Sequence, residues 1–171
     1  MPDRESFFVS TGQVVTGTGN TILESSPLGS CIAVCAIDHA SSAGGMAHIM
    51  LPGKSPYENA HNKYRYAADA LQELVACLQS VGCDLARMKT CLIGGANVLK
   101  REKDTIHTDN LKSITKLLSQ MQIKVHESCT GGFERRTALM DITEGRIFVA
   151  IGSQPQRQLL DCSNVAARKT D

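Results

Sequence analysis

The hydrophobic pattern of this chain is strongest in two apolar runs that lie close together in its first third. The first run, residues 31–38 (CIAVCAID), consists of β-branched and small side chains and becomes polar only at its last position. The second run, residues 44–52 (GGMAHIMLP), has the same character apart from one histidine. Short continuous runs of this kind are typical of strands that are buried on both faces. We therefore predict two neighbouring strands inside a sheet.

Helical periodicity replaces this pattern in two later segments. Apolar side chains recur at three- and four-residue steps between Tyr64 and Leu78, which places them on one face of a helix that Gly82 is suited to end. A second helix is predicted after the polar segment 100–108, with Thr108 as its N-cap. Its apolar face consists of Leu111, Ile114, Leu117, Leu118 and Met121.

The rest of the chain carries shorter strand signals and turns. A hairpin is predicted from residues 137–142 and 146–151, and the polar residues from 153 on are expected to form a loose tail. The other predicted strands are residues 7–9, 13–16, 21–23, 88–93 and 123–126. No internal repeat or linker is visible, so residues 1–171 are expected to form one domain of the α/β (α+β) class with a layered mixed sheet.

Composition and charge exclude several classes of protein. Hydrophobic residues make up 42% and charged residues 20% of the 171 positions, as in an ordinary globular domain. The formal net charge of +1 implies no general attraction to nucleic acid. No run approaches the roughly 20 apolar residues of a membrane span. The charged N-terminus is not followed by a signal-like apolar block, so a cytoplasmic location is expected.

The seven cysteines fit a reducing compartment. No two of them are spaced as a C-x-x-C pair, which argues against zinc-ribbon and thioredoxin chemistry. Most are expected to be small buried hydrophobic residues. They are Cys31, Cys35, Cys77, Cys83, Cys91, Cys129 and Cys162.

One cysteine differs from the others in its surroundings. Cys31 follows the turn Gly29-Ser30, whose backbone N–H groups could stabilise an oxyanion, and it begins the strand next to the one that contains His48. A cysteine and a histidine on neighbouring strands can form a thiol–imidazole pair for nucleophilic catalysis. Cys35 lies on the same face but deeper, and is expected to be a core residue. The structural alternative is that Cys31 is a buried thiol and His48 a core histidine bonded to the backbone.

Three rival sites are disfavoured by their spacing. Cys31, Cys35 and His39 recur every four residues, which would align metal ligands on a helix, but the run around them is β-like. Residues 16–20 (TGTGN) resemble a phosphate loop without its third glycine and its lysine. Ser30 lacks the G-x-S-x-G surroundings of a serine nucleophile. No metal or organic cofactor is predicted, and the remaining histidines are expected to be solvated: His39, His61, His107 and His126.

Two motifs together resemble the CheD family of chemoreceptor glutamine deamidases. They are residues 28–34 (LGSCIAV) and residues 45–52 (GMAHIMLP), and the resemblance depends on both motifs and on the short segment that separates them. The likeness continues through Lys63-Tyr64, residues 93–97 (IGGAN) and residues 130–132 (TGG). It therefore extends over most of the chain, roughly from Phe8 to Ile151.

The resemblance implies a hydrolase that converts selected glutamine side chains of methyl-accepting chemotaxis receptors to glutamate and releases ammonia. In the family pattern, Cys31 is the nucleophile, His48 is the general base and acid, and the turn at Gly29 and Ser30 surrounds the oxyanion. The third catalytic residue of the family is a threonine upstream of the cysteine. That place falls here on Ser25 or Ser26, of which Ser25 is favoured, because a serine hydroxyl can also orient an imidazole. The family fold is a mixed-sheet sandwich with outer helices, related to bacterial toxin deamidases.

The resemblance also implies protein partners. These are the cytoplasmic helices of chemoreceptors as substrate and the phosphatase CheC as a binding partner, without nucleic acid and without membrane insertion. The alternative is a regulatory module that binds CheC or a receptor helix with little catalysis. An enzyme is expected to hold Cys31 at a lowered pKa and to be alkylated there fast near neutral pH, whereas an adaptor would have uniformly sluggish thiols.

Overall fold

The two apolar runs form adjacent antiparallel strands, β4 (Ile32–Asp38) and β5 (Ala43–Ile49), in which every residue is buried. In the computed structural model, which describes residues 3–57 and 61–164, these strands lie inside a five-stranded sheet of order β2-β5-β4-β6-β7. The other strands of this sheet are β2 (Val14–Thr18), β6 (Lys89–Gly94) and β7 (Glu127–Thr130).

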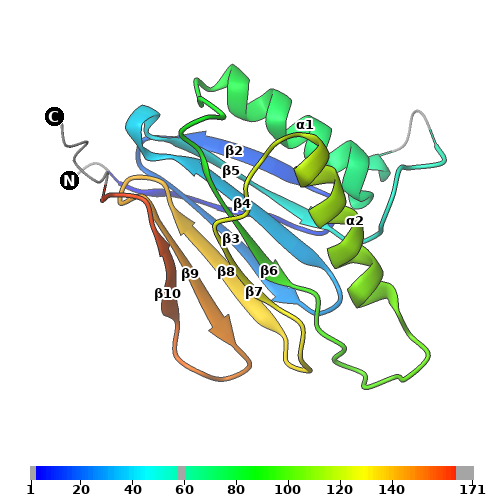
Figure 1. Ribbon diagram of the computed structural model, residues 1–171. Coiled ribbons are helices and arrows are strands. Elements are labelled where there is room, and N and C mark those ends of the chain that lie inside the picture. The colour runs from blue at the N-terminus through cyan, green and yellow to red at the C-terminus, as the bar shows by residue number, and fades with distance from the viewer. Residues whose placement is uncertain (1–2, 58–60, 165–171) are drawn as a thin grey trace, which may run out of the picture.

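A second five-stranded sheet lies against the first, with the order β1-β3-β8-β9-β10 (Figure 1). Its strands are β1 (Glu5–Phe8), β3 (Thr21–Leu28), β8 (Arg136–Asp141), β9 (Arg146–Ile151) and β10 (Arg157–Asp161). β1 pairs with β3 in parallel, as β6 does with β7, and the other pairs are antiparallel. The prediction of an α+β fold with layered mixed sheets is therefore confirmed.

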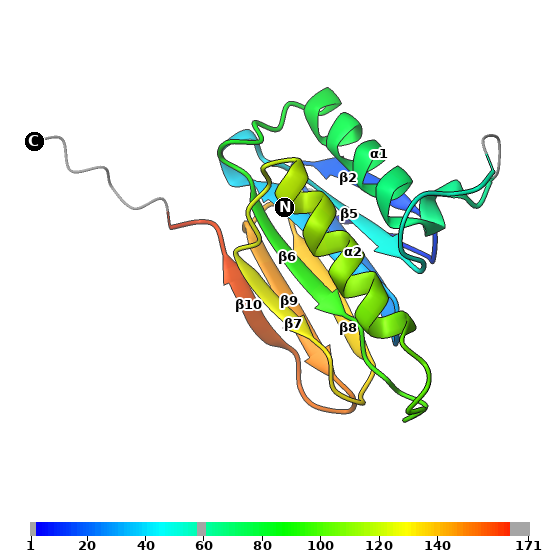
Figure 2. The same cartoon turned by 45° about the vertical axis from the view of Figure 1, so that its right-hand side comes forward.

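The helices α1 (Ala67–Ser80) and α2 (Ile106–Gln120) cover the outer face of the first sheet, as Figures 1 and 2 show. Alternation along β4 divides its side chains between two cores. Ala33, Cys35 and Ile37 pack between the two sheets, whereas Ile32 and Val34 pack beneath the helices. A strand with apolar neighbours on both faces reads as a continuous hydrophobic run, which explains the pattern seen in the sequence.

Three predicted elements differ from the structure. No strand forms at 123–126, where one was expected, and β7 begins instead at Glu127. In this position β7 pairs with β6, and the Cys129 side chain enters the core between the sheets. α2 begins at Ile106 rather than near Thr108. The segment expected to be a loose tail from 153 contains β10, which pairs with β9, and residues 165–171 of that segment lie outside the described residues.

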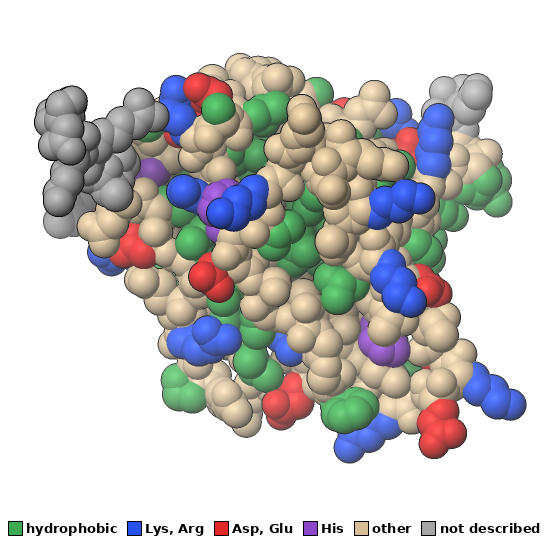
Figure 3. All heavy atoms as spheres, in the orientation of Figure 1, with side chains coloured by type: hydrophobic (Ala, Val, Ile, Leu, Met, Phe, Trp, Pro, Cys, Tyr) green, Lys and Arg blue, Asp and Glu red, His purple; other side chains and the backbone are tan. Residues whose placement is uncertain are grey.

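Charged side chains are dispersed over the surface. Figure 3 shows Lys and Arg interspersed with Asp and Glu over the face it presents, without a large area of one sign, in line with the net charge of +1. Among the helices of the described residues, none is both long and apolar enough to cross a membrane.

Candidate active site

The turn that carries Cys31 is held against the loop that follows β6. The Gly95 N–H donates to the Cys31 carbonyl at 2.9 Å, and the Ala96 N–H donates to the Gly29 carbonyl at 2.8 Å. These two bonds attach the end of one strand to the beginning of its neighbour, since β4 and β6 pair directly. Cys31 therefore has a fixed backbone position at the mouth of the space between the sheets.

Gly94 makes this close approach possible. Its φ is +122°, and a Cβ at this position would overlap the Cys31 carbonyl oxygen. We expect Gly94→Ala to destabilise the protein by at least about 3 kcal/mol, because both backbone strain and a collision with rigid backbone are introduced. Any activity that depends on the Cys31 thiol should fall with it, since the collision displaces the cysteine. Thermal unfolding measures the first effect and a turnover assay the second.

Gly82 is the matched control for this substitution. Its φ is +92°, but nothing lies within 4 Å of an added Cβ. Gly82→Ala should therefore cost only the strain of an unfavourable backbone conformation, about 1–2 kcal/mol, and leave turnover unchanged. Equal losses of stability in the two variants would contradict the role assigned to the contact between Gly94 and Cys31.

Cys31 is the partly exposed thiol at the beginning of β4. Its side chain packs against the core between the sheets, on the face that Ala33 and Cys35 share. Burial raises the pKa of the Cys31 thiol, and the N–H of the same residue offsets part of that rise. The expectation of a lowered pKa is therefore wrong, because the loss of solvent outweighs the backbone donor. The resting group is a neutral thiol. Cys35 is fully buried, as predicted.

His48 lies on the same face of the same sheet. It pairs with Ala33 across the β4–β5 ladder, and Cys31 is two residues from Ala33, so cysteine and histidine are diagonal neighbours. Side chains in such positions are about 7 Å apart at their bases, within reach of a sulfur and an imidazole. His48 is 3% exposed, and burial lowers the pKa of its imidazole, partly offset by its bond to the Val9 carbonyl. The resting imidazole is consequently neutral.

Hydrogen bonds determine which ring nitrogen carries the proton. His48 Nδ1 lies 2.9 Å from Ser25 Oγ and 3.2 Å from the Val9 carbonyl oxygen, while the Ser25 hydroxyl donates to that carbonyl at 2.7 Å. A carbonyl only accepts, and the single serine proton is already engaged, so Nδ1 must be the donor. Nε2 is left with its lone pair and can accept a proton.

The structure decides which of the two candidate serines meets the histidine. Ser25, on β3 of the opposite sheet, is fully buried and contacts the ring. The Ser26 hydroxyl instead lies 2.9 Å from Thr137 Oγ1. Successive residues of a strand point to opposite faces, so only one of the two can reach His48.

Thr11 is a neighbour of the imidazole that sequence reasoning missed. Its Oγ1 lies 3.4 Å from His48 Nε2, and the adjacent Gly12 N–H donates to the His48 carbonyl at 2.9 Å. The Thr-Gly turn was visible in the sequence, but nothing local indicated that it would close over β5.

Within the described residues, no hydrogen bond joins the Cys31 thiol to His48. Hydrogen bonds between catalytic groups are often long or poorly aligned until substrate is bound, so the missing bond does not argue against the pair.

Backbone donors at the turn remain unused. In residues 3–57 and 61–164, neither the Ser30 N–H nor the Cys31 N–H donates a hydrogen bond to another residue. Gly29 and Ser30 therefore lie where the sequence placed them, in a turn with N–H groups available next to the sulfur. Such groups can stabilise the oxyanion of an acyl-transfer intermediate.

The remaining histidines and the rival metal ligands do not contribute to this site. Of the four histidines expected to be solvated, His61 is exposed, whereas His39, His107 and His126 are half-buried by neighbouring side chains. The extended β4 spreads Cys31, Cys35 and His39 over about 26 Å, too far for one ion. No cluster of three potential metal ligands occurs in the part of the chain that the structure describes.

Comparison with known proteins gives consistent matches. The family model described as CheD chemotactic sensory transduction matches residues 50–151, a region that begins two residues after His48. A protein of Chlorobium luteolum named probable chemoreceptor glutamine deamidase CheD is 49% identical over 151 residues, covering 88% of this chain and 75% of the relative. The chemoreceptor glutamine deamidase CheD of Thermotoga maritima is 33% identical over 122 residues, covering 71% and 76%. A probable CheD of Pyrococcus horikoshii is 28% identical over 142 residues.

Proposed function

Because the chain belongs to the CheD family, we propose that it is a chemoreceptor glutamine deamidase in which Cys31, His48 and Ser25 carry the reaction. Its substrates are glutamine side chains on the cytoplasmic helices of methyl-accepting chemotaxis receptors, and its products are glutamate and ammonia. The observation that supports the proposal most directly is the bond between Ser25 and His48 Nδ1. It leaves Nε2 basic on the face where the thiol lies.

The first half of the reaction forms a thioester. Nε2 of His48 takes the proton of the Cys31 thiol as the sulfur attacks the carboxamide carbon, so that a neutral pair becomes active only when substrate is present. The N–H groups at Ser30 and Cys31 stabilise the oxyanion of the tetrahedral intermediate. The imidazolium then gives its proton to the departing nitrogen, ammonia leaves, and a γ-glutamyl thioester remains.

The second half regenerates the enzyme. His48 removes a proton from a water molecule, which attacks the thioester carbonyl, and the sulfur departs and recovers its proton. The sum is one amide and one water converted to one carboxylic acid and one ammonia. Each step uses only water and the side chains and backbone N–H groups of this chain.

Ser25→Ala is expected to lower kcat/KM about tenfold. The substitution removes one neutral acceptor of the Nδ1 proton, worth about 1.4 kcal/mol, and that free energy corresponds to roughly a factor of ten in rate. The fold should survive, because the Val9 carbonyl still accepts from the ring. Steady-state turnover of receptor fragments measures the effect.

Two further variants calibrate this result. Ser25→Thr keeps the hydroxyl and should retain most of the parental activity, while Ser26→Ala removes a hydroxyl that faces Thr137 and should change little. If Ser26→Ala lowered turnover and Ser25→Ala did not, the assignment of the third residue would be reversed.

The proposed function is tested with purified receptor cytoplasmic fragments. The protein should release ammonia from them and convert individual glutamines to glutamate, detected by peptide mass spectrometry. Free glutamine and unfolded carrier protein serve as competing substrates and should react far more slowly. A protein that binds the fragments, or CheC, without forming glutamate would support the regulatory alternative and refute the deamidase.

A further inference from the structure

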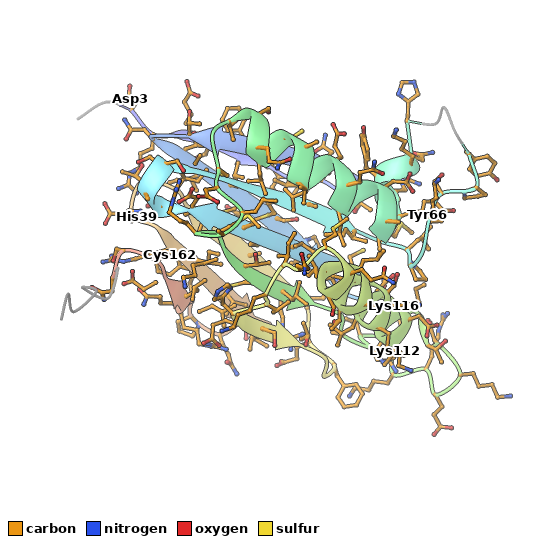
Figure 4. The ribbon with its side chains drawn as sticks, turned by 45° about the horizontal axis from the view of Figure 1, so that its top comes forward. Asp3, His39, Tyr66, Lys112, Lys116 and Cys162 are labelled. Atoms are coloured by element: carbon orange, nitrogen blue, oxygen red, sulfur yellow. The ribbon has the colours of Figure 1, made fainter. Side chains whose placement is uncertain are left out.

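Asn110 is a buried amide on the inner side of α2 that touches both segments of the proposed site. Its side chain is fully buried, whereas Lys112 and Lys116 lie on the exposed side of the same helix (Figure 4). The Asn110 Nδ2 group donates to the Ser30 carbonyl at 3.0 Å and to the Met50 carbonyl at 2.9 Å. One side chain thus connects the residue before Cys31 to a residue two positions beyond His48.

The bond to Ser30 sets the direction of the next N–H group. The peptide between Ser30 and Cys31 is trans, so its carbonyl and its N–H point in opposite directions. Because the carbonyl is directed toward α2, the Cys31 N–H is directed away from the helix layer. That side of the sheet is the one on which the Cys31 side chain packs.

The Ser30 carbonyl is the only one of the three turn carbonyls that depends on a side chain. The Gly29 and Cys31 carbonyls accept from backbone N–H groups of the loop 95–96. Without Asn110, the middle peptide of the turn would be free to rotate between two fixed neighbours. Rotation of this peptide would turn the Cys31 N–H away from the reacting carbon.

The amide oxygen of Asn110 argues against a role in packing alone. Asn110 Oδ1 is buried without a hydrogen-bond partner in the described part of the chain. An apolar side chain would fill the same volume without an unpaired acceptor. The residue type is therefore explained by its two N–H groups and the carbonyls they bind.

We propose that Asn110 is a positioning residue of the active site, which orients the peptide between Ser30 and Cys31 so that its N–H stabilises the oxyanion. This inference rests on the proposed use of Cys31 as nucleophile. It predicts that Asn110 affects attack on a carbonyl, which creates an oxyanion, but not attack on an alkyl carbon, which creates none.

The test compares two reactions of the same thiol. In the first, p-nitrophenyl acetate acylates Cys31: the sulfur–carbon bond forms, and p-nitrophenolate leaves after an oxyanion intermediate. In the second, iodoacetamide alkylates Cys31 and iodide leaves. Both rates are followed at Cys31 by peptide mass spectrometry in the full chain, for the parent protein and for Asn110→Leu and Asn110→Ser. Ser113→Ala is the control, because Ser113 lies on the same helix and its hydroxyl accepts from the Gly53 N–H rather than bonding to the turn at Ser30.

We expect acylation to fall about 100-fold in both Asn110 variants, the usual effect of losing one oxyanion donor, while alkylation stays near the parental rate. Ser113→Ala should change neither rate. The proposal would be overturned if the acylation and alkylation rates fell equally, if neither rate fell, or if both variants failed to fold. In each case the amide would have a structural role or none. A parent protein that acylates readily but does not deamidate receptors would refute the proposed function alone.

Discussion

Cys31→Ala should abolish glutamine deamidation. The substitution removes the only atom proposed to bond to the substrate, and loss of a nucleophile in comparable enzymes costs about 10⁵-fold or more in kcat. Stability should change little, because the thiol is partly exposed and makes no hydrogen bond to another side chain within the described residues. The measurement is conversion of receptor glutamines by peptide mass spectrometry, together with the release of ammonia.

Cys77→Ala is the matched control for this experiment. Cys77 is the other half-buried thiol, whereas the remaining five are buried, and it lies on α1, away from the turn. Its removal should leave turnover at the parental level. Glutamate formation by the Cys31→Ala protein at anything near the parental rate would mean that a different group attacks the amide. Parental binding of receptor fragments by an inactive variant would separate recognition from chemistry.

His48→Asn should lower kcat about 10³-fold and change the form of the pH profile. The asparagine amide can still donate to the Val9 carbonyl, so the packing around the ring is retained while the basic Nε2 is lost. Removal of a positioned acid–base group typically costs 10²- to 10⁴-fold. Turnover is measured from about pH 5 to pH 10, a range that spans the ordinary pKa values of histidine and cysteine.

The direction of each pH effect follows from the two pKa shifts. The parental reaction needs neutral His48, and burial lowers the pKa of that ring, so activity should persist below about pH 6.5 and be lost as the pH falls through the lowered value. In His48→Asn, the thiol can ionise only by itself. Because burial raises the pKa of Cys31, the residual rate should rise steadily with pH into the alkaline range.

His126→Asn provides the control for loss of an imidazole. His126 is half-buried beside β6, where its Nδ1 accepts from the Thr90 N–H at 3.2 Å, near the end of β6 opposite to Gly94. This variant should keep the parental acid limb. An acid limb that survived in His48→Asn would show that another group governs the low-pH loss, and the role of His48 as base would be wrong.

Local sequence patterns were sufficient for the elements that frame the site. The apolar runs at 31–38 and 44–52 predicted β4 and β5, and the helical periodicity between Tyr64 and Leu78 predicted α1. Alternation along β4 placed Cys31 and Cys35 on one face, with Cys35 buried in the core. These inferences succeed because side-chain direction follows a period of two residues in a strand and 3.6 in a helix, whatever lies further away.

Contacts between distant segments could not be obtained in this way. Ser25 reaches His48 from the opposite sheet, Thr11 from a turn between two edge strands, and Asn110 contacts the site from a helix 80 positions after Ser30. The direction of the Cys31 pKa shift also depends on packing, since burial outweighs the backbone donor only after the sheets are stacked. The residues around each of these positions in the sequence do not indicate which distant segment will contact it.

The sequence by itself therefore determined the strand pair, the turn before Cys31 and the presence of a thiol and an imidazole on neighbouring strands, because these follow from backbone periodicity over a few residues. The tertiary structure was needed to show which serine contacts the ring, which ring nitrogen carries the proton and which amide donates to the Ser30 carbonyl. Each of these depends on hydrogen bonds between elements far apart in the chain, and such bonds exist only after the two sheets and α2 have packed together.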